Sequence, residues 1–356
     1  MALKCYNHNI KKVTGKEGSI MKVTIHSVAQ EAGVSTTTVS KVINHTGSIS
    51  EQTRKKVWEA MKKLNYSPDV AAASLRGKRT KAFGLLVPDV SNPFYAEVAR
   101  SIEDRSHDFG YNVMMCNTDN DSEKEKSYLS LLTSQRIDGL VVASAFRSPD
   151  LLEEMLDKGF PMVLLASDIP KLSVNTVTVD DYKGGYLATS HLLSLGHKRI
   201  AIIIENVRSN TARMDAFKEA MLEADLPIPD GFIVKTEATI RKGYQSGKKI
   251  LSMKERPSAI FASNDLLAAG VLQAAKEVGL NVPQDLSVVG FDNTVLSTTT
   301  SPMLTTISQP IKLMGAKAVE LLIGEMKEEK MNKERLLLSP ELIIRQSTAK
   351  FNIAKK

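Results

Sequence analysis

The chain has 356 residues, of which 42% are hydrophobic and 24% charged, an ordinary composition for a globular protein. This length allows about two domains and an appendage, and the composition excludes a disordered chain or a long coiled coil. No apolar run reaches the length of a membrane span, and residues 1–20 contain no apolar block of the signal-peptide type. We therefore expect a soluble, cytoplasmic protein.

The formal net charge of +7 is concentrated at one end of the chain. Residues 1–80 contain 14 Lys and Arg against 5 Asp and Glu, whereas the other 276 residues contain 33 against 35. A basic end on a nearly neutral body predicts an appendage that binds nucleic acid. The alternative is a solvated basic tail, which a folding pattern in this region would disfavour.

Residues 24–66 have such a pattern, that of three short amphipathic helices. Thr24, Ser35 and Ser50 are helix-capping residues, and Gly33 suits a tight turn between the first two helices. Behind the caps, apolar residues recur at intervals of three and four: Ile25, Val28, Ala29 and Ala32, then Val39, Val42 and Ile43, then Val57, Met61 and Leu64. This arrangement predicts a helix-turn-helix whose second helix enters the DNA major groove.

The second helix begins with consecutive hydroxyl side chains. Ser35 caps it, while Thr36 and Thr37 in its first turn can reach phosphates, base edges or a thymine methyl. Lys41 follows one and a half turns later. Threonines at a helix start are often competing caps and a lone lysine is usually solvated, but in a helix-turn-helix we expect Ser35, Thr36, Thr37 and Lys41 to contact DNA.

These residues resemble the headpiece of the lactose-repressor (LacI/GalR) family of bacterial transcription regulators. The resemblance rests on VTIHSVAQEAGVSTTTVSKVIN and the following ISEQTRKKVWEAMKKLNYSPDVAAASLRGKRT, and it extends from about Met21 to about Thr348. It implies that Thr36, Thr37 and Lys41 occupy operator-reading positions. Many members have an arginine where this chain has Lys41, and lysine lacks the planar fork that grips guanine through two hydrogen bonds.

Residues 68–80, PDVAAASLRGKRT, resemble the hinge of the same family. The segment is too short to be a stable helix alone. The resemblance implies that it folds on DNA, with Leu75 wedged into a base step of the minor groove. Ala72 is small enough to approach the groove floor, and Arg76 and Lys78 suit phosphates. The alternative is a charged linker, which would leave the exposed Leu75 unexplained.

Residues 1–20 match nothing in the family. Lys16-Glu17-Gly18 can be encoded as AAG GAG GGN, a ribosome-binding sequence, with only the codons of Ser19 and Ile20 before that of Met21. We therefore hypothesise that translation starts at Met21 and that residues 1–20 are a translated leader. The alternative is that residues 1–20 form a basic arm that adds phosphate contacts.

From Ala82 onward, apolar runs alternate with amphipathic helical stretches. The runs are FGLLVPD, NVMMCN, DGLVVAS, PMVLLAS, RIAIII, SAIFAS and LSVVGFD. Alternation of strands and helices predicts parallel sheets with helices on both faces, and the number of strands favours two lobes. The resemblance implies the two-lobed, type I periplasmic-binding-protein-like body with three crossings between lobes, which we place near Asp180, Thr306 and Lys333.

We therefore expect an α/β protein: an all-α helix-turn-helix headpiece and a hinge helix, then a body of two parallel doubly wound sheets. The expected divisions are a leader or disordered arm at 1–20, the headpiece at 21–66, the hinge at 67–80 and an effector-binding and dimerisation body at 81–350, with an N-lobe at about 81–180 and 308–332 and a C-lobe at about 181–306 and 334–348. A homodimer is expected because two headpieces must occupy the half-sites of a palindromic operator. The ending TAKFNIAKK lacks the leucine heptad through which some family members form tetramers.

Ligands of open parallel sheets bind at the carboxyl ends of the strands, which in a two-lobed body face the cleft. The polar and aromatic residues that follow strands are the effector-binding candidates: Asn92, Phe94, Tyr95, Arg213, Asn264, Asp265, Asp292 and Gln309. Each alone is explained as a cap or turn residue. Together, an arginine, carboxylates, amides and aromatic rings suit a hydroxyl-rich small molecule such as a sugar or sugar derivative.

One segment departs from the family. Many sugar-responsive members carry Asp-Arg directly after the fourth strand, where this chain has Ala166 and Ser167, with Asp168 one place later. A strongly hydrogen-bonded pentose is therefore not implied, and a different effector, or none, remains open.

Two other classes of function fit the sequence less well than a regulator does. A free-standing sugar-binding protein would share the body but would need an export signal and no headpiece. An enzyme would need a phosphate-binding glycine loop or a nucleophile with its base, and neither is evident; Cys5 and Cys116 lie far apart without metal-ligand spacing. We expect a sequence-specific transcriptional regulator, a repressor, with no enzymatic activity, cofactor or metal; its partners would be a double-stranded DNA operator, a sugar-like effector and a second copy, and no membrane.

Overall fold

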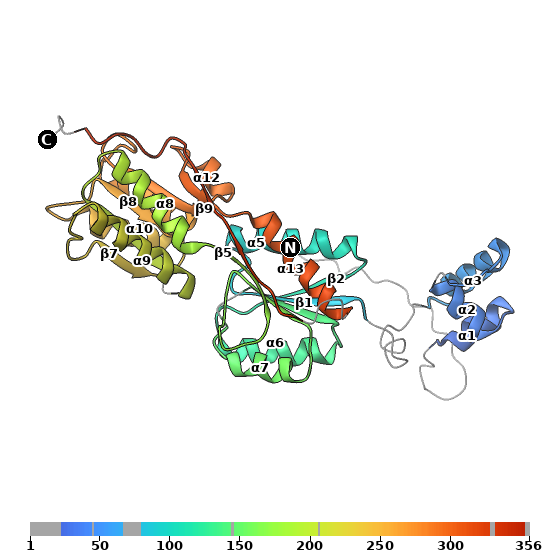
Figure 1. Cartoon of the computed structure of the whole chain (residues 1–356). Helices are drawn as coiled ribbons and strands as arrows, with labels where there is room; N and C mark the ends of the chain where they lie inside the picture. The colour runs from blue at the N-terminus through green and yellow to red at the C-terminus, as the bar shows by residue number, and fades with distance from the viewer. Residues whose placement is uncertain are drawn as a thin grey trace, which may run out of the picture. The chain divides into compact units, whose positions relative to one another are not determined.

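The computed structural model describes residues 23–44, 46–66, 80–143, 146–205, 207–327 and 332–352. The chain forms two compact units, residues 1–78 and 79–356 (Figure 1). Residues 1–20 and the hinge candidates Ala72, Leu75, Arg76 and Lys78 lie outside the described residues.

The first unit contains the three predicted helices, α1 (Ile25–Ala32), α2 (Thr36–Ile43) and α3 (Glu51–Lys63). Gly33 ends α1 in the left-handed conformation, with a φ of 64°, which a residue without a Cβ adopts at no steric cost. The helices pack on a small core made of Val28, Ala29, Val39, Val42, Val57, Ala60 and Met61. The periodicity of three and four residues therefore places these helices correctly.

The second unit is a two-lobed α/β body. The N-lobe is built from β1 (Ala82–Val87), α5 (Pro93–Asp108), β2 (Asn112–Asn117), α6 (Ser122–Ser134), β3 (Gly139–Val142), α7 (Pro149–Asp157), β4 (Met162–Leu165), β5 (Asn175–Val179), α13 (Ile311–Met326) and β11 (Arg335–Leu338). The C-lobe is built from α8 (Asp181–Ser194), β6 (Ile200–Glu205), α9 (Arg208–Glu223), β7 (Ile233–Thr236), α10 (Ile240–Leu251), β8 (Ala259–Ala262), α11 (Asp265–Glu277), β9 (Ser287–Asp292), α12 (Val295–Thr299), β10 (Thr305–Ser308) and β12 (Glu341–Ile343).

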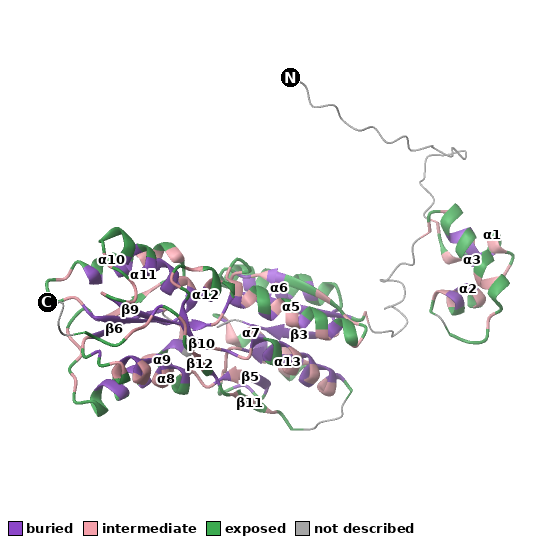
Figure 2. Cartoon of the chain, turned by 90° about the horizontal axis from the view of Figure 1, so that it is seen from above, coloured by how far each residue is buried: buried purple, intermediate pink, exposed green. Residues whose placement is uncertain are grey.

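Each lobe contains one six-stranded sheet. The strand order is β11-β5-β4-β3-β1-β2 in the N-lobe and β12-β10-β9-β8-β6-β7 in the C-lobe. All neighbouring strands are parallel except β12, which runs antiparallel to β10. Figure 2 shows the buried strands between layers of helices, as expected for apolar strands covered on both faces. The predicted fold class is confirmed.

Three crossings join the lobes, and two lie later in the chain than expected. The first lies at Asp180, between β5 and α8. The second follows β10, at residues 309–310, rather than near Thr306, because Thr306 pairs with Gly290 in the C-lobe sheet. The third lies at residues 339–340 rather than near Lys333, because β11 pairs with β5 of the N-lobe.

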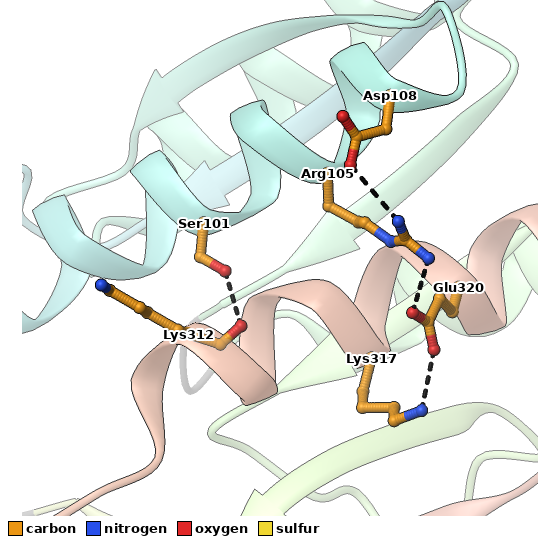
Figure 3. A network of polar contacts seen from close by, with 6 residues as sticks. All are labelled: Ser101, Arg105, Asp108, Lys312, Lys317 and Glu320. Carbon is orange, nitrogen blue, oxygen red and sulfur yellow. Dashed lines mark hydrogen bonds and ion pairs between the residues drawn. The ribbon is translucent and has the colours of Figure 1, made fainter.

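The second crossing brings α13 against α5 of the N-lobe. Figure 3 shows the polar contacts along this seam, which involve Ser101, Arg105, Asp108, Lys312, Lys317 and Glu320. The helices approach closely at Gly315, where a Cβ would lie 2.6 Å from the Ser101 hydroxyl. Ser101 also donates to the Lys312 carbonyl at 2.7 Å, and Arg105 pairs with Glu320 at 2.9 Å. These contacts join a segment from the last third of the chain to the first helix of the lobe.

Candidate functional site

The recognition helix α2 divides its hydroxyl groups between two roles. The Ser35 hydroxyl accepts a hydrogen bond from the Thr38 backbone nitrogen at 3.1 Å, and the Ser35 and Thr38 hydroxyls lie 2.9 Å apart. Thr36 and Thr37 therefore remain outside the cap, and Thr37 is exposed. A run of four hydroxyl residues thus closes the helix start with two members and leaves two in its first turn.

Lys41 is exposed and lies beside the loop that follows α2. A Cβ on Gly47 would be 3.3 Å from the Lys41 Cδ, so the lysine stem lies against the glycine backbone. Gly47 has a φ of 74°, a left-handed conformation that favours glycine. The positions expected to touch DNA, Ser35, Thr36, Thr37 and Lys41, therefore belong to one short helix with a firm amino-terminal cap.

The body contains a cavity of about 640 Å³ between its lobes. Seven of the eight predicted effector-binding residues line it: Asn92, Phe94, Tyr95, Arg213, Asn264, Asp292 and Gln309. They come from α5 in the N-lobe, from the ends of strands and starts of helices in the C-lobe, and from the second crossing. The rule that ligands meet the carboxyl ends of strands therefore identifies the lining of a real cavity.

Asp265 is the exception, because it does not line the cavity. Its side chain accepts hydrogen bonds from the Thr294 backbone nitrogen at 2.7 Å and from the Thr306 hydroxyl at 2.7 Å. Desolvation raises the pKa of Asp265 to about 6, and the threonine hydrogen bonds oppose that rise. The carboxylate thus joins β10 to the loop after β9, a structural task that its position after a strand could not reveal.

Arg213, near the start of α9, is held by several groups. Its Nη2 lies 2.7 Å and its Nε 2.8 Å from an Asp181 carboxylate oxygen, and another nitrogen donates to the Ser263 carbonyl. The guanidinium also lies 3.5 Å from the centroid of the Phe291 ring. Burial raises the pKa of Asp181, and the Arg213 charge opposes this effect. Arg213 is therefore fixed in place and only 7% exposed.

Asp292 occupies a strained position at the end of β9. Its φ of 111° is rare for a residue with a side chain, and such strain is often kept at binding sites. Its carboxylate accepts a hydrogen bond from Gln309 Nε2 at 2.7 Å. Desolvation raises the pKa of Asp292 well above its usual range, with Arg213 opposing and the negative Asp265 adding to the rise. This pair connects the C-lobe strand end to the second crossing.

Tyr95 brings the N-lobe into the same electrostatic environment. Burial of its hydroxyl raises the pKa of Tyr95, and the negative charges of Glu205 and Asp292 raise it further. Phe94 contacts Tyr95 edge to face, with ring centroids 5.0 Å apart. Carboxylates of the C-lobe therefore act electrostatically on the hydroxyl of an N-lobe residue across the cavity.

The two amide candidates act at least partly as caps. Asn92 Oδ1 accepts from the Phe94 backbone nitrogen at 3.0 Å, and Asn264 Oδ1 accepts from the Leu267 backbone nitrogen at 2.8 Å. Their ordinary explanation as helix caps therefore holds for the oxygen atoms. Both side chains nevertheless line the cavity.

Several lining residues were absent from the sequence prediction. Glu205 ends β6, and Asn210 lies in the first turn of α9. Glu205 directly follows the apolar run RIAIII, so the rule applied to the other strands would have found it. The segment that departs from the family, Ala166 to Asp168, also lines the cavity, where Asp168 pairs with Arg335.

The described residues contain no group of three or more His, Cys, Asp and Glu placed to hold a metal ion. Within the same residues, no helix combines the length and the apolar character needed to cross a bilayer.

Comparison with known proteins supplies the family. The profile described as "Bacterial regulatory proteins, lacI family" matches residues 24–69, and that of a periplasmic binding protein-like domain matches residues 189–348. The HTH-type transcriptional regulator DegA of Bacillus subtilis (strain 168) is 44% identical over 337 residues, which cover 93% of this chain and 100% of DegA. The chain belongs to the lacI family of bacterial regulatory proteins.

Solved structures agree with this assignment. The structure of the Lac repressor dimer bound to operator and the anti-inducer ONPF is 28% identical to this lacI-family protein, with a TM-score of 0.81. The match covers 92% of the present chain and 99% of the Lac repressor chain. A lacI-family transcriptional regulator from Enterococcus faecium with bound ribose is 34% identical, with a TM-score of 0.70, covering 76% of this chain and 100% of that one. This lacI-family protein is a DNA-binding transcriptional regulator with a ligand-binding type of body, and the relatives named here are regulators, which fits the expectation of a non-enzyme.

Proposed function

We propose that the protein binds a palindromic operator as a homodimer and represses transcription, and that a small molecule in the interlobe cavity changes its affinity for the operator. The observation that carries the proposal is the presence, in one chain, of a capped recognition helix and a cavity lined from both lobes. A DNA-binding helix and a small-molecule cavity in one chain allow a bound ligand to change the affinity for DNA, through a coupling free energy between the two sites.

The recognition helix supplies the contacts to DNA. A helix that enters the major groove by its first turn presents Thr36 and Thr37 to base edges or phosphates. Lys41, on the next turns, adds a positive charge that releases counterions from the duplex. The hinge candidates Ala72, Leu75, Arg76 and Lys78 would complete the grip in the minor groove, with Leu75 as a wedge that kinks the duplex.

The cavity supplies the control. A ligand that touches Tyr95 on one side and Asp292 on the other bridges two lobes joined by three short crossings. Such a ligand favours one spacing of the lobes over another, and therefore shifts the equilibrium between two arrangements of the dimer. Couplings of this kind are typically about 1–3 kcal/mol.

Lys41→Ala separates base recognition from charge. If Lys41 contacts a base, the variant loses about 1–3 kcal/mol of affinity for its operator and little for random DNA. If Lys41 contacts a phosphate, both affinities fall together and the salt dependence becomes shallower. Titrations against both DNAs at several salt concentrations distinguish the two, and Lys254→Ala, an exposed lysine of the body, serves as the control. Unchanged binding to both DNAs would remove Lys41 from the interface.

Selection of binding sites from a random DNA library tests the whole proposal. The purified protein is expected to enrich one palindrome, bound by two protomers, and the double variant Thr36→Ala/Thr37→Ala is expected to lose that enrichment. A free-standing solute-binding protein, the alternative function, would enrich no sequence. Enrichment of a single half-site by one protomer would refute the dimer.

A further inference from the structure

The interlobe cavity is strongly acidic. Among the described residues, its lining contains eight carboxylate residues, one guanidinium, and no lysine or histidine. The carboxylates are Asp89, Asp119, Asp168, Asp180, Asp181, Glu205, Glu237 and Asp292, and the guanidinium is that of Arg213. A concave, partly dry surface of one sign concentrates ligands of the opposite charge.

Half of these carboxylates already have a cation. Asp181 pairs with Arg213 at 2.7 Å and Glu237 with Lys242 at 3.7 Å, while Asp119 pairs with Lys124 and Asp168 with Arg335. Arg213, the one cationic residue of the described lining, is therefore already engaged. Four carboxylates form no ion pair with any described residue: Asp89, Asp180, Asp292 and Glu205.

Three of the four accept hydrogen bonds from neutral groups. Asp89 accepts from the Ser91 hydroxyl at 2.6 Å, Asp180 from the Lys183 backbone nitrogen at 2.9 Å, and Asp292 from the Gln309 amide at 2.7 Å. These contacts satisfy lone pairs but add no positive charge. The described lining of the cavity therefore keeps an excess of negative charge.

Glu205 is the least supported of the four. Its backbone nitrogen donates a hydrogen bond to the Ser263 hydroxyl oxygen at 3.2 Å, which fixes the residue at the end of β6. Its carboxylate receives no hydrogen bond and forms no ion pair with any described residue. Desolvation raises its pKa, and only the charge of Arg213 opposes that rise. A partly buried carboxylate without a donor is poised to accept one from a ligand.

Asn210 gives an independent indication of a ligand. The side chain is 3% exposed and lines the same cavity, yet its Oδ1 has no hydrogen-bond partner. A buried acceptor left without a donor costs about 1–3 kcal/mol, so a protein retains one mainly where something else supplies the donor. Glu205 and Asn210 thus offer two unused acceptors to one cavity.

We infer that the effector is a small polyhydroxylated amine, bound as its ammonium form with the positive charge at Glu205. An ammonium group has three donors and no acceptor, which matches a carboxylate and an amide oxygen that lack donors. Hydroxyl groups of the same ligand suit Asp292 and the aromatic rings of Phe94 and Tyr95. A neutral sugar leaves the excess charge uncompensated, and a phosphorylated or carboxylated sugar is repelled. This inference rests on the proposed function of the cavity and names its ligand class.

Matched ligand sets test the inference on the full-length protein. D-glucosamine, D-galactosamine and D-mannosamine are each compared with the parent hexose, the N-acetyl derivative and the 6-phosphate, first by thermal shift and then by calorimetric titration. At least one amine is expected to bind about tenfold or more tighter than its neutral partners, as loss of a charge-assisted hydrogen bond implies. Tighter binding of a neutral or phosphorylated sugar, or no binding of any amine, would overturn the inference.

Substitution of the carboxylate localises the charge effect. Glu205→Gln keeps the shape of the side chain, and its preference for the amine over the parent hexose is expected to disappear. Glu237→Gln is the matched control, because Glu237 lines the same cavity but already pairs with Lys242. A preference that survives Glu205→Gln would place the ammonium elsewhere and refute the assignment. Site selection from random DNA does not use the cavity, so a recovered palindrome without amine binding would refute this inference alone.

Discussion

Gly270→Ala is expected to disrupt the packing of α10 on α11 and to destabilise the C-lobe by about 3 kcal/mol or more. A Cβ at Gly270 would lie 2.2 Å from the Ile240 carbonyl oxygen and 2.4 Å from the Tyr244 backbone nitrogen. Gly243 makes the reciprocal approach, where a Cβ would lie 2.4 Å from the Leu267 carbonyl oxygen. These neighbours are backbone atoms, so relief requires one helix to move as a whole.

Calorimetric unfolding of Gly270→Ala measures this cost, and Gly324→Ala provides the control. Gly324 lies inside α13, and a Cβ there would meet nothing within 4 Å. Alanine is the better helix former by about 1 kcal/mol, so Gly324→Ala is expected to stabilise the body slightly. Equal unfolding transitions for the two variants would show that the close approach of α10 and α11 is not required.

Arg213→Ala is expected to destabilise the body by about 3–5 kcal/mol, because it leaves the Asp181 carboxylate buried without its cation. The Asp181 side chain is only 15% exposed, and burial already raises its pKa despite the guanidinium. Without Arg213 the pKa of Asp181 in the folded state rises further above its unfolded value. The deficit in stability is therefore full at neutral pH and shrinks as the pH falls through the folded-state pKa, where the carboxyl becomes protonated.

A double variant isolates this mechanism. Asp181→Asn removes the charge while keeping the shape, so Asp181→Asn/Arg213→Ala is expected to be more stable than Arg213→Ala alone at neutral pH. Urea unfolding of the wild type, both single variants and the double variant at two pH values measures the coupling. If the double variant is no more stable than Arg213→Ala, the cost arises from lost packing on Phe291 and not from an unpaired charge.

The sequence predicts the headpiece well because its signals are local. Caps at Ser35 and Ser50, the glycine at the turn and apolar residues every three or four positions act within single helices. The strands found in the sequence are those with long apolar runs. Strands β5, β7, β11 and β12 were not among the apolar runs identified. The Thr-rich sequence NTVTV of β5 resembles a loop, and β12 has only three residues.

The crossings were misplaced for a related reason. Residues 335–343, RLLLSPELI, form a nearly continuous apolar run, yet β11 belongs to one sheet and β12 to the other. Pairing between distant segments decides which strand joins which sheet, and no local pattern carries that information. Ser339, Pro340 and Glu341 interrupt the run, and the crossing lies at the first two of them.

In the candidate site, too, local position in the sequence predicts some features, and contacts between distant segments decide the others. Position after a strand correctly brought seven residues to one cavity, but it could not distinguish Asp265, whose partners are Thr294 and Thr306 of distant loops and strands. The engagement of Arg213 by Asp181 likewise depends on the packing of α8 against α9. Glu205 could have been predicted from the sequence, since it directly follows the apolar run RIAIII.

The coupling between the cavity and DNA tests the central claim most directly. Affinity for the selected palindrome is measured with and without a ligand that binds the cavity, and ligand affinity is measured with and without the palindrome. Both affinities are expected to change by one common factor, about 5- to 150-fold, because a coupling free energy is shared by the two sites. A ligand that saturates the cavity and leaves the affinity for the palindrome unchanged would contradict the account.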